Sequence, residues 1–491
     1  MKRVASAILP LIVIDRKAPA ALYQQIYDAY RSAIVGRMIR PGQRVPSTRT
    51  LAEELGVSRL PILNAYAQLL AEGYFQSRVG AGTVVSRSLP DQLPAASTAR
   101  PAKTAPGVRQ LSRRDFASAS DKNVPWLRGW GPFGVSQVAF DHFPFSVWNS
   151  LIMRRCRHSF AKSLDYGDPM GLEKLRSAIA NYVRTARGVR CEDDQIMVVS
   201  GSQQALEITA RVLVNPGNSV WMEEPGYRFA HRVFSFHNCR VVPVPIDYEG
   251  MNVREGIRLA RHARAALVTP SHQYPLGVTM SASRRLQLLD WAEHYGAWVI
   301  EDDYDSEFRY ESMPIASLQG LDSNSRVIYV GTFSKVVFPS LRLGYIIVPR
   351  DLIRAFLSVR LAMDIAPSYF FQAVMADFIE QNHFSRHIRR MRIVYGERRE
   401  ALTASLRNAF GFRAEIEGGQ AGMHLSVTLK GIRDQEIALR AATQNLWLLP
   451  LSTSYLQKPL RHGFILGFGS TSAGQMPAAV QKLKALTIRS R

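Results

Sequence analysis

Cysteine is scarce in this chain, and long apolar runs are missing from it. The 491 residues include three cysteines, Cys156, Cys191 and Cys239, scattered without any paired spacing, so neither a disulfide framework nor a zinc site is expected. No stretch approaches the roughly 18 uninterrupted apolar residues of a membrane span. The N-terminal run SAILPLIVI contains Pro10 and leads directly into charged DRK, which argues against a signal peptide. These features favour a soluble protein of the reducing cytoplasm.

Acidic residues are too few to balance the basic ones. The chain has 40 Asp and Glu against 62 Lys and Arg, a formal net charge of +22. This excess favours a polyanionic partner such as nucleic acid, although an anionic membrane surface would also attract it. Charge by itself does not choose between these partners.

The composition changes sharply at residues 87–121, which are rich in Pro, Ala, Ser and Thr and have no sustained apolar period. This is the composition of a flexible linker. It predicts a small domain over residues 1–86 and a large one over residues 122–491. Neither part contains an evident internal repeat.

The first part has the pattern of two helices joined by a tight turn. A preceding helix is indicated by apolar residues at helical spacing from Leu22 to Ile34 and should end before Pro41. Ser47 then predicts the start of a helix that runs through Leu55, and Gly56 suits the turn. Ser58 predicts the start of a second helix, with Pro61 in its first turn. The run QSRVGAGTVVSR that follows predicts a basic hairpin, or wing.

A helix-turn-helix places its second helix in the major groove, while basic residues around it contact phosphates. The candidate residues for contact with double-stranded DNA are Arg44, Ser47, Arg49, Ser58, Arg59 and Arg78. A solvated basic face on a small helical domain is the alternative explanation of each arginine.

Three stretches of this part resemble the winged helix-turn-helix of the GntR family: PGQRVPSTRTLAEELGVSR, AYAQLLAEGYF and GAGTVV. The similarity covers nearly all of residues 18–86. Family members usually carry Thr where this chain has Pro61, so a hydroxyl contact to phosphate is not expected there. The resemblance implies an operator in double-stranded DNA as the partner.

The second part alternates strand-like apolar runs with helix-like stretches. The strand-like runs are QIMVVS, SVWME, AALVT, AWVIED, RVIYVGTF and LGYIIV. This rhythm predicts an α/β domain with a mainly parallel sheet, whose ligand should lie at the carboxyl ends of the strands.

Chemically active residues follow several of these runs. SGSQQALEI opens a helix whose N-terminal amides suit a phosphate, and EDDYDSEF supplies carboxylates that would also suit a metal site or a surface acid cluster. TFSK supplies Lys335, and Arg342 follows seven residues later. One joint interpretation is a site for pyridoxal phosphate, in which a lysine forms a Schiff base and a carboxylate keeps the pyridine nitrogen protonated.

The same part resembles the fold-type I aminotransferases over nearly all of residues 130–475. The motifs that carry the resemblance occur in the family's order: YGDPMGLEKLR, VVSGSQQALEI, EEPGYRFA, TPSHQYPLG, EDDYDSEFRY and GTFSKVVFPSLRLGY. It implies a pyridoxal-phosphate-dependent transferase fold with a smaller C-terminal α/β lobe.

The resemblance also implies roles for individual residues. Lys335 matches the lysine that forms the aldimine, Asp302 the acid that faces the pyridine nitrogen, and Tyr304 the phenol near the ring oxygen. Tyr227 would stack on the ring. The phosphate would be held by Ser202, Gln203, Thr332 and Arg342, with Tyr166 reaching across from a partner subunit. Tyr227 could instead be an ordinary core aromatic, and Arg342 a surface ion-pair partner.

The chain departs from the aminotransferase pattern at two places. Tyr274-Pro275-Leu276-Gly277 stands where Asn-Pro-Thr-Gly is common, so the asparagine contact to the cofactor is absent and His272 or Gln273 would have to replace it. The stretch GFILGFGS is apolar where many aminotransferases use an arginine for the substrate carboxylate, and Arg461 is a poor match.

A GntR-like reader joined to an aminotransferase-like domain resembles the MocR group of transcription regulators, from about Leu9 to the end of the chain. This implies a homodimer, including a domain-swapped arrangement, whose aldimine at Lys335 senses pyridoxal phosphate or an amino-group effector. The alternatives are an active aminotransferase with a DNA-binding domain and a DNA-binding protein whose large domain has lost the cofactor.

Overall fold

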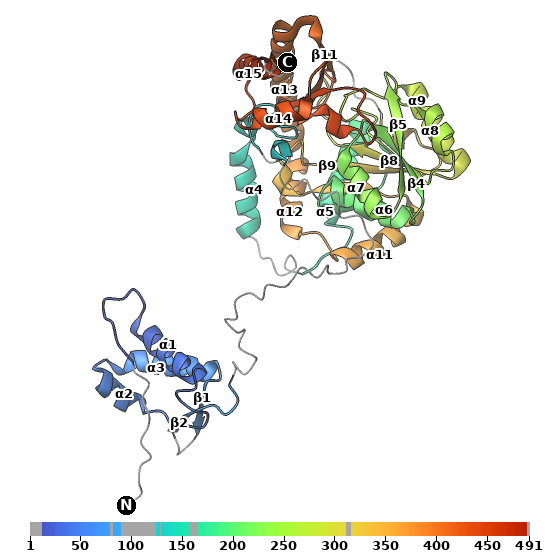
Figure 1. Cartoon of the computed structure of the whole chain (residues 1–491). Coiled ribbons are helices and arrows are strands. Elements are labelled where there is room, and N and C mark those ends of the chain that lie inside the picture. The colour runs from blue at the N-terminus through green and yellow to red at the C-terminus, as the bar shows by residue number, and fades with distance from the viewer. Residues whose placement is uncertain are drawn as a thin grey trace, which may run out of the picture. The chain divides into compact units, whose positions relative to one another are not determined.

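The computed structural model describes residues 12–78, 82–89, 124–127, 129–157, 165–310 and 316–488. The chain divides into two compact units, Met1–Gln110 and Leu111–Arg491, which are coloured blue and teal to red in Figure 1. Most of the predicted linker lies outside the described residues. Among the described helices, none is both long enough and apolar enough to cross a membrane.

The first unit is a three-helix domain with a short hairpin. Its elements are α1 (Leu22–Val35), α2 (Thr48–Leu55), α3 (Arg59–Ala71), β1 (Phe75–Arg78) and β2 (Gly82–Val85). The core contains the predicted Ile26, Tyr30, Ala33 and Ile34 of α1. Tyr30 packs edge-on against Tyr66 and Phe75, with ring centroids 5.6 and 5.5 Å away. These contacts join α1, α3 and the hairpin.

The starts of α2 and α3 differ, although a serine precedes both helices. Ser47 Oγ accepts a hydrogen bond from the backbone N–H of Thr50 at 3.1 Å, as an N-cap does. Ser58 makes no such side-chain bond. The residue three positions after Ser58 is Pro61, which has no N–H to donate. The predicted helix boundary is therefore correct, but its side-chain cap is missing.

The second unit contains a mixed sheet of eight strands, in the order β3-β10-β9-β8-β7-β4-β5-β6. The strands are β3 (Ile196–Val199), β4 (Ser219–Glu224), β5 (Arg240–Asp247), β6 (Gly250–Met251), β7 (Ala265–Val268), β8 (Trp298–Asp303), β9 (Val327–Thr332) and β10 (Gly344–Ile347). The pairs from β9 through β5 are parallel, whereas β10 is antiparallel to both β9 and β3. The predicted mainly parallel α/β sheet is thus confirmed.

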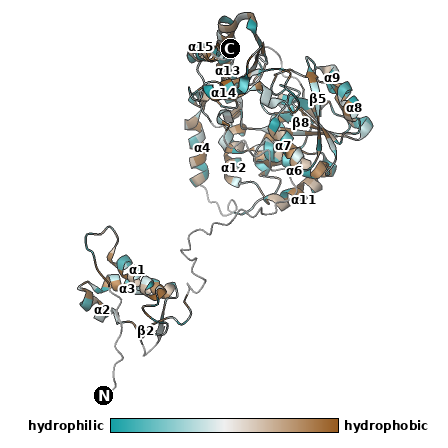
Figure 2. Ribbon diagram, viewed as in Figure 1, coloured by the Kyte–Doolittle hydropathy of each residue, from teal (hydrophilic) through white to brown (hydrophobic). Residues whose placement is uncertain are grey.

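Helices cover both faces of this sheet. The helices are α4 (Phe145–Arg157), α5 (Glu173–Arg187), α6 (Ser202–Leu213), α7 (Arg228–Phe236), α8 (Val253–Ala260), α9 (Ala282–Tyr295), α10 (Leu318–Leu321), α11 (Ile353–Met363), α12 (Tyr369–Glu380) and α13 (His383–Phe410). Val220 and Met222 of β4 pack in one apolar cluster with residues of α6 and α7. Trp221 points to the other face and stacks on Trp291 of α9 at 3.8 Å. The helices carry both hydrophobic and hydrophilic residues (Figure 2), as amphipathic helices on a sheet do.

The smaller C-terminal lobe is built on a four-stranded antiparallel sheet in the order β11-β12-β14-β13. Its elements are β11 (Ala414–Glu417), β12 (His424–Leu429), α14 (Asp434–Ala442), β13 (Leu449–Pro450), β14 (Gly463–Gly467) and α15 (Met476–Ile488). Residues of β12, β14 and α15 join the apolar core that also contains α5, α12 and α13. The lobe is therefore packed on the large sheet domain rather than standing apart from it.

The capping difference gives a stability prediction. We expect Ser47→Ala to cost about 1 kcal/mol by removing the hydrogen bond to Thr50, and so to speed hydrogen exchange of the α2 amides about fivefold. Ser58→Ala should leave the α3 amides nearly unchanged, because no capping bond is lost there. Exchange measured by mass spectrometry on the full chain compares the two variants. Equal effects at both helices would contradict the assignment.

Candidate functional site

A cavity of about 520 Å³ lies at the carboxyl ends of the central strands of the large sheet. The predicted site residues that line it are Ser202, Gln203, Tyr227, Asp302, Tyr304, Thr332, Lys335 and Arg342. They come from β8 and β9, the turn after each, and the starts of α6 and α7. The parallel pairing of β8 with β9, in which Asp302 lies opposite Val330, brings the two strand ends together.

Lys335 and Asp302 both line this cavity and both have clearly shifted pKa values. Burial lowers the pKa of Lys335 to about 8, although Asp305 and Asp302 oppose this shift. Burial and the neighbouring Asp303 raise the pKa of Asp302 to about 7, while Lys335 opposes that shift. Asp302 is only 5% exposed, and its Oδ1 has no hydrogen-bond partner. A buried carboxylate oxygen without a donor is costly, and here it faces a cavity.

The start of α6 and the turn after β9 form a cradle of donors. Gly201 precedes α6 with φ of +101°, and a methyl group on it would lie 3.6 Å from the guanidinium of Arg342. Thr332 Oγ1 accepts a hydrogen bond from the Ser334 backbone N–H at 3.2 Å. Within the described part of the chain, Arg342 makes no ion pair with a carboxylate. A guanidinium, hydroxyls and helix N-terminal amides together suit a phosphate.

Aromatic residues form one side of the cavity. Tyr227 and Tyr274 meet edge-on with centroids 5.7 Å apart, and burial raises the pKa of both hydroxyls. Tyr304 also lines the cavity, but its hydroxyl lies 3.0 Å from Nδ1 of His272. His272 is buried behind Tyr304 and is absent from the cavity wall. Gln273 is absent from the wall too, and its amide donates to the backbone oxygen of Pro225 at 2.9 Å.

Two residues considered from the sequence lie outside the cavity. Tyr166 does not line the cavity of its own chain, and its side chain is 72% exposed. Arg461 forms an ion pair with Glu417 at 2.7 Å and lines a separate groove. On β14, where an arginine for a substrate carboxylate would be sought, Ile465 is fully buried against Leu276 and Leu449.

The cavity wall also contains residues that the sequence did not single out. They include Trp126, Trp130, Gln137, Arg228, Asp305, Met423, His424, Thr453 and Ser454. Asp305 belongs to the EDDYDSEF stretch, so its proximity to Asp302 could have been anticipated. His424 lies on β12 of the small lobe, and no local pattern connects a single histidine in an apolar strand with a site made by another lobe.

The candidate DNA contacts lie on or beside α2 and α3 of the first unit. Arg49 on α2 and Arg59 at the start of α3 are both exposed, and Arg59 Nε donates to Thr48 Oγ1 at 3.1 Å. Arg44 is exposed, and its guanidinium lies beside Gly82 of β2. Ser47 and Ser58 precede the two helices, and Arg78 lies in β1 opposite Gly82. The arrangement brings Arg59 close to the start of both helices.

Comparisons with known proteins match both units. Residues 22–85 match the model of the bacterial regulatory proteins of the gntR family, and residues 131–465 match aminotransferase class I and II. The chain is 38% identical to a probable rhizopine catabolism regulatory protein, MocR, of Rhizobium meliloti, over 96% of this chain and 95% of that protein. The chain belongs to the MocR family of transcription regulators.

Two further comparisons concern a regulator that matches nearly the whole chain and an aminotransferase structure that matches 79% of it. An HTH-type pyridoxine biosynthesis transcriptional regulator, PdxR, of Corynebacterium glutamicum is 29% identical, with 94% of each chain covered. A kynurenine aminotransferase of Pyrococcus horikoshii, solved in complex with PMP, superimposes with a TM-score of 0.68 at 27% identity, over 79% of this chain and 96% of that one. This chain is thus a DNA-binding regulator with an aminotransferase fold, for which the cofactor is pyridoxal phosphate.

The residues of the cavity fit this cofactor. Lys335 offers an amine of lowered pKa, and Asp302 offers an unpartnered oxygen for a protonated pyridine nitrogen. The cradle beside Gly201 has room and donors for the phosphate. The fit rests on the chemistry of these groups, above all on the unpartnered oxygen of Asp302, rather than on the size of the cavity.

The two arginines of the helix pair should have different effects on DNA affinity. We expect Arg49→Ala to weaken all duplexes about equally and to lower the salt slope by about one, because a phosphate contact is lost. Arg59→Ala should cost roughly 1–3 kcal/mol mainly on the cognate duplex, because we expect the first residue of a recognition helix to contact a base edge.

Salt titrations with specific and random duplexes measure both effects. Arg37→Ala is a control, since Arg37 is exposed in the same unit but lies outside the helix pair. The control should change DNA affinity by less than about twofold. If Arg49→Ala and Arg59→Ala also change it by less than that, the arginines form only a solvated basic face.

Proposed function

We propose that this regulator responds at Lys335 to pyridoxal phosphate itself or to an amino-group compound that reacts with the bound cofactor. The observation that supports it most is the pairing, in one cavity, of a lysine of lowered pKa with a buried carboxylate oxygen that has no partner. Strongly shifted pKa values of a lysine and a carboxylate in one cavity are typical of a functional site. The printed name of PdxR, which concerns pyridoxine biosynthesis, adds support for the cofactor as a signal.

When bound, pyridoxal phosphate supplies an aldehyde that condenses reversibly with amines and a ring that withdraws electrons. Lys335 Nζ is the amine of this chain that would hold it covalently. Asp302 would hold a proton on the pyridine nitrogen, and Tyr227 would lie against the ring. Ser202, Gln203, Thr332 and Arg342 would hold the phosphate. Each of these residues lines the same cavity.

An active aminotransferase is the second candidate. The match to aminotransferase class I and II over residues 131–465 favours it. The ion pair of Arg461 with Glu417 and the burial of Ile465 speak against an amino-acid pocket of the usual kind. Steady production of a keto acid over many turnovers would support the enzyme, whereas a single stoichiometric reaction would support the sensor.

We propose that the protein is a homodimer that binds an operator in the cytoplasm. Tyr166 of one subunit would lie at the cavity of the other. A domain-swapped arrangement is one form that this dimer could take. Tyr166 supports this, since it is exposed and lies outside its own cavity. The relatives named as transcription regulators support the cytoplasm, where bacterial DNA lies.

The lowered pKa of Lys335 predicts how fast the apo-protein takes up its cofactor. Only the neutral amine attacks an aldehyde, and a pKa of about 8 leaves roughly a tenth of the lysine neutral at pH 7 against well under 1% for an ordinary lysine. The uptake rate should therefore rise with pH and level off above about 8. Stopped-flow absorbance measures it.

Borohydride reduction followed by peptide mass spectrometry locates the covalent bond. Lys335→Ala should take up cofactor without a reducible bond and should leave the operator affinity of the protein insensitive to pyridoxal phosphate. Duplexes selected by the protein from a random pool serve as the operator. A reducible bond at another lysine, or an unchanged DNA response in Lys335→Ala, would refute the assignment.

Mixed dimers test the role of Tyr166. Tyr166→Phe should weaken cofactor affinity about tenfold, because one hydrogen bond to a charged phosphate is lost. A dimer of a Tyr166→Phe chain with a Lys335→Ala chain has one intact site only if Tyr166 acts on the partner. Its remaining reducible site should then bind with wild-type affinity. Light scattering that shows a monomer at micromolar concentration, or an affinity that stays low, would contradict the proposal.

A further inference from the structure

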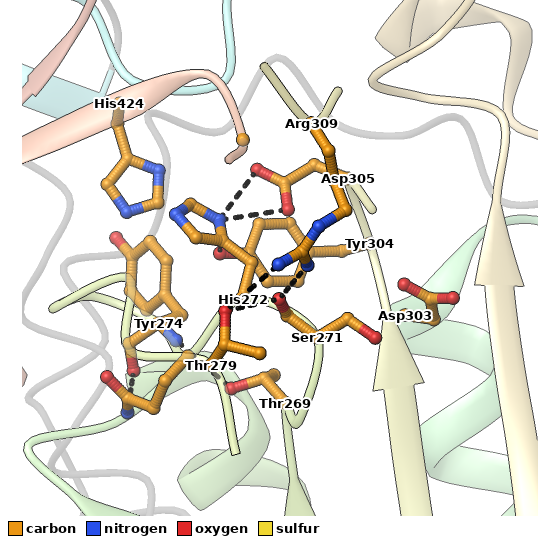
Figure 3. Close-up of polar contacts among 12 residues, drawn as sticks. Thr269, Ser271, His272, Tyr274, Thr279, Asp303, Tyr304, Asp305, Arg309 and His424 are labelled. Atoms are coloured by element: carbon orange, nitrogen blue, oxygen red, sulfur yellow. Dashed lines mark hydrogen bonds and ion pairs between the residues drawn. The ribbon is translucent and has the colours of Figure 1, made fainter. Parts of the chain in front are cut away.

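At the cavity wall, Tyr304 and Asp305 are joined through the buried His272 by a series of close polar contacts (Figure 3). The Tyr304 hydroxyl lies 3.0 Å from Nδ1 of His272, and the same nitrogen lies 3.1 and 3.2 Å from the two carboxylate oxygens of Asp305. Tyr304 and Asp305 follow β8, while His272 follows β7, so two neighbouring strand ends build the chain. His272 and Asp305 are both buried.

The positions of the acceptors decide where the protons lie. An ionised carboxylate only accepts hydrogen bonds, so Nδ1 of His272 must carry the proton that Asp305 receives. Nε2 of His272 is buried and has no hydrogen-bond partner. An N–H there would leave an unsatisfied donor, whereas a neutral ring leaves only a lone pair. The contacts therefore favour the neutral ring with its proton on Nδ1.

This tautomer determines the direction of the Tyr304 hydroxyl. Since Nδ1 is the donor, the Tyr304 oxygen can only accept from it, and the tyrosine's own proton is free to point into the cavity. We propose that His272 and Asp305 are positioning residues that turn the Tyr304 hydroxyl into a donor toward the ring oxygen of the bound cofactor. This inference rests on the proposed function, and it assigns His272 a role through Tyr304 rather than direct contact with the cofactor.

The same contacts explain how the chain manages without the asparagine of the usual Asn-Pro-Thr-Gly motif. Tyr274 stands at that position and points toward His424 (Figure 3), with ring centroids 5.4 Å apart. A tyrosine whose hydroxyl proton is fixed by a histidine and a carboxylate is a better donor than one free to rotate. The oriented hydroxyl of Tyr304 would thus replace the missing asparagine amide as the hydrogen-bond donor to the cofactor.

The histidine ring fits only because two glycines flank it. A methyl group on Gly422, whose φ is +73°, would lie 2.0 Å from Cε1 of His272. A methyl group on Gly277, whose φ is +72°, would lie 2.9 Å from Nε2 of His272. The close packing holds the ring in one orientation. It also separates Nε2 from the solvent that could otherwise satisfy it.

A metal ion is the competing explanation of this cluster. Ligand atoms of His272, Asp305 and His424 lie within 4.8 Å of one another. An ion bound at Nδ1 of His272 would displace the hydrogen bonds to Asp305, and His424 Nε2 already lies 3.1 Å from the backbone oxygen of Pro275. The observed contacts therefore favour the proton chain.

The test is the pH at which the visible spectrum of the bound cofactor changes from its acid to its base form, measured on the full-length protein. A hydrogen bond to the ring oxygen stabilises its negative charge, so losing the donor raises this midpoint. We expect increases of about one pH unit for both Tyr304→Phe and His272→Leu. The other titratable groups near Tyr304, His272 and Asp305 are unchanged in these variants. They are Glu223, Tyr274, Asp302, Arg309, Lys335 and His424.

Two polar variants of His272 give matched controls. The side-chain amide of His272→Asn can place a donor near the position of Nδ1, whereas His272→Gln places its amide near Nε2. The midpoint should stay within about 0.3 units of wild type in His272→Asn and rise in His272→Gln. If His272→Leu does not fold, this pair still decides the question. Equal midpoints for Asn and Gln would overturn the inference.

The double variant His272→Leu/Tyr304→Phe shows whether His272 acts through Tyr304. The two shifts should not add, because the second substitution removes a hydroxyl that has already lost its orientation. Additive shifts would overturn the inference, and so would a midpoint that changes on adding zinc or a chelator to wild type. Failure of the wild type to bind pyridoxal phosphate would instead reject the proposed function, so the two failures are distinguishable.

Discussion

The attraction between the half-buried Lys335 and the buried Asp302 and Asp305 is the interaction on which the cavity of the large unit depends. Burial lowers the pKa of Lys335 and raises that of Asp302, and the attraction between the two groups opposes both shifts. This balance requires the two strand ends to lie side by side, and the parallel register of β8 with β9 provides it. Gly331 of β9 has no side chain because a methyl group there would lie 2.2 Å from the ring of Tyr345 on β10. The packing of the strands therefore fixes the positions of the groups that line the cavity.

A buried ion pair, between Arg187 and Asp303, lies at the acidic end of β8 outside the cavity wall. Arg187 on α5 contacts Asp303 at 2.8 Å and also donates to Ser271 Oγ at 2.8 Å. Asp303 is thereby paired away from the cavity, while its neighbour Asp302 keeps a free oxygen toward it. Alternation along the strand separates a carboxylate in a buried ion pair from one that lines the cavity. Removing Arg187 would leave a buried charge without its partner, which is strongly destabilising.

Most of the sheet, and the residues that line the cavity at the strand ends, could be predicted from the sequence because their signals are local. Apolar runs mark the strands, and Lys335 and Asp302 directly follow or end two of them. β5 was not predicted, because Pro243 and Pro245 interrupt its pattern. These prolines are tolerated because β5 pairs along its length with β4 on one side and meets β6 only at its end. The contact of Asp305 with His272 and that of His424 with Pro275 join segments far apart in the chain, which periodicity cannot reveal.

Ligand binding at Lys335 and DNA binding involve different units of the chain. The effect of one on the other is therefore described by a coupling free energy. A ligand at Lys335 alters DNA affinity only if it binds two conformations of the protein unequally, and about 1–3 kcal/mol of difference changes affinity 5- to 150-fold.

The segment of residues 129–137 connects the wall of the cavity with the small lobe. It lines the cavity through Trp130 and Gln137, and it is bonded to the small lobe where Trp447 Nε1 donates to the backbone oxygen of Trp130 at 2.9 Å. A ligand that moves this wall of the cavity therefore also moves a segment that is hydrogen-bonded to the small lobe.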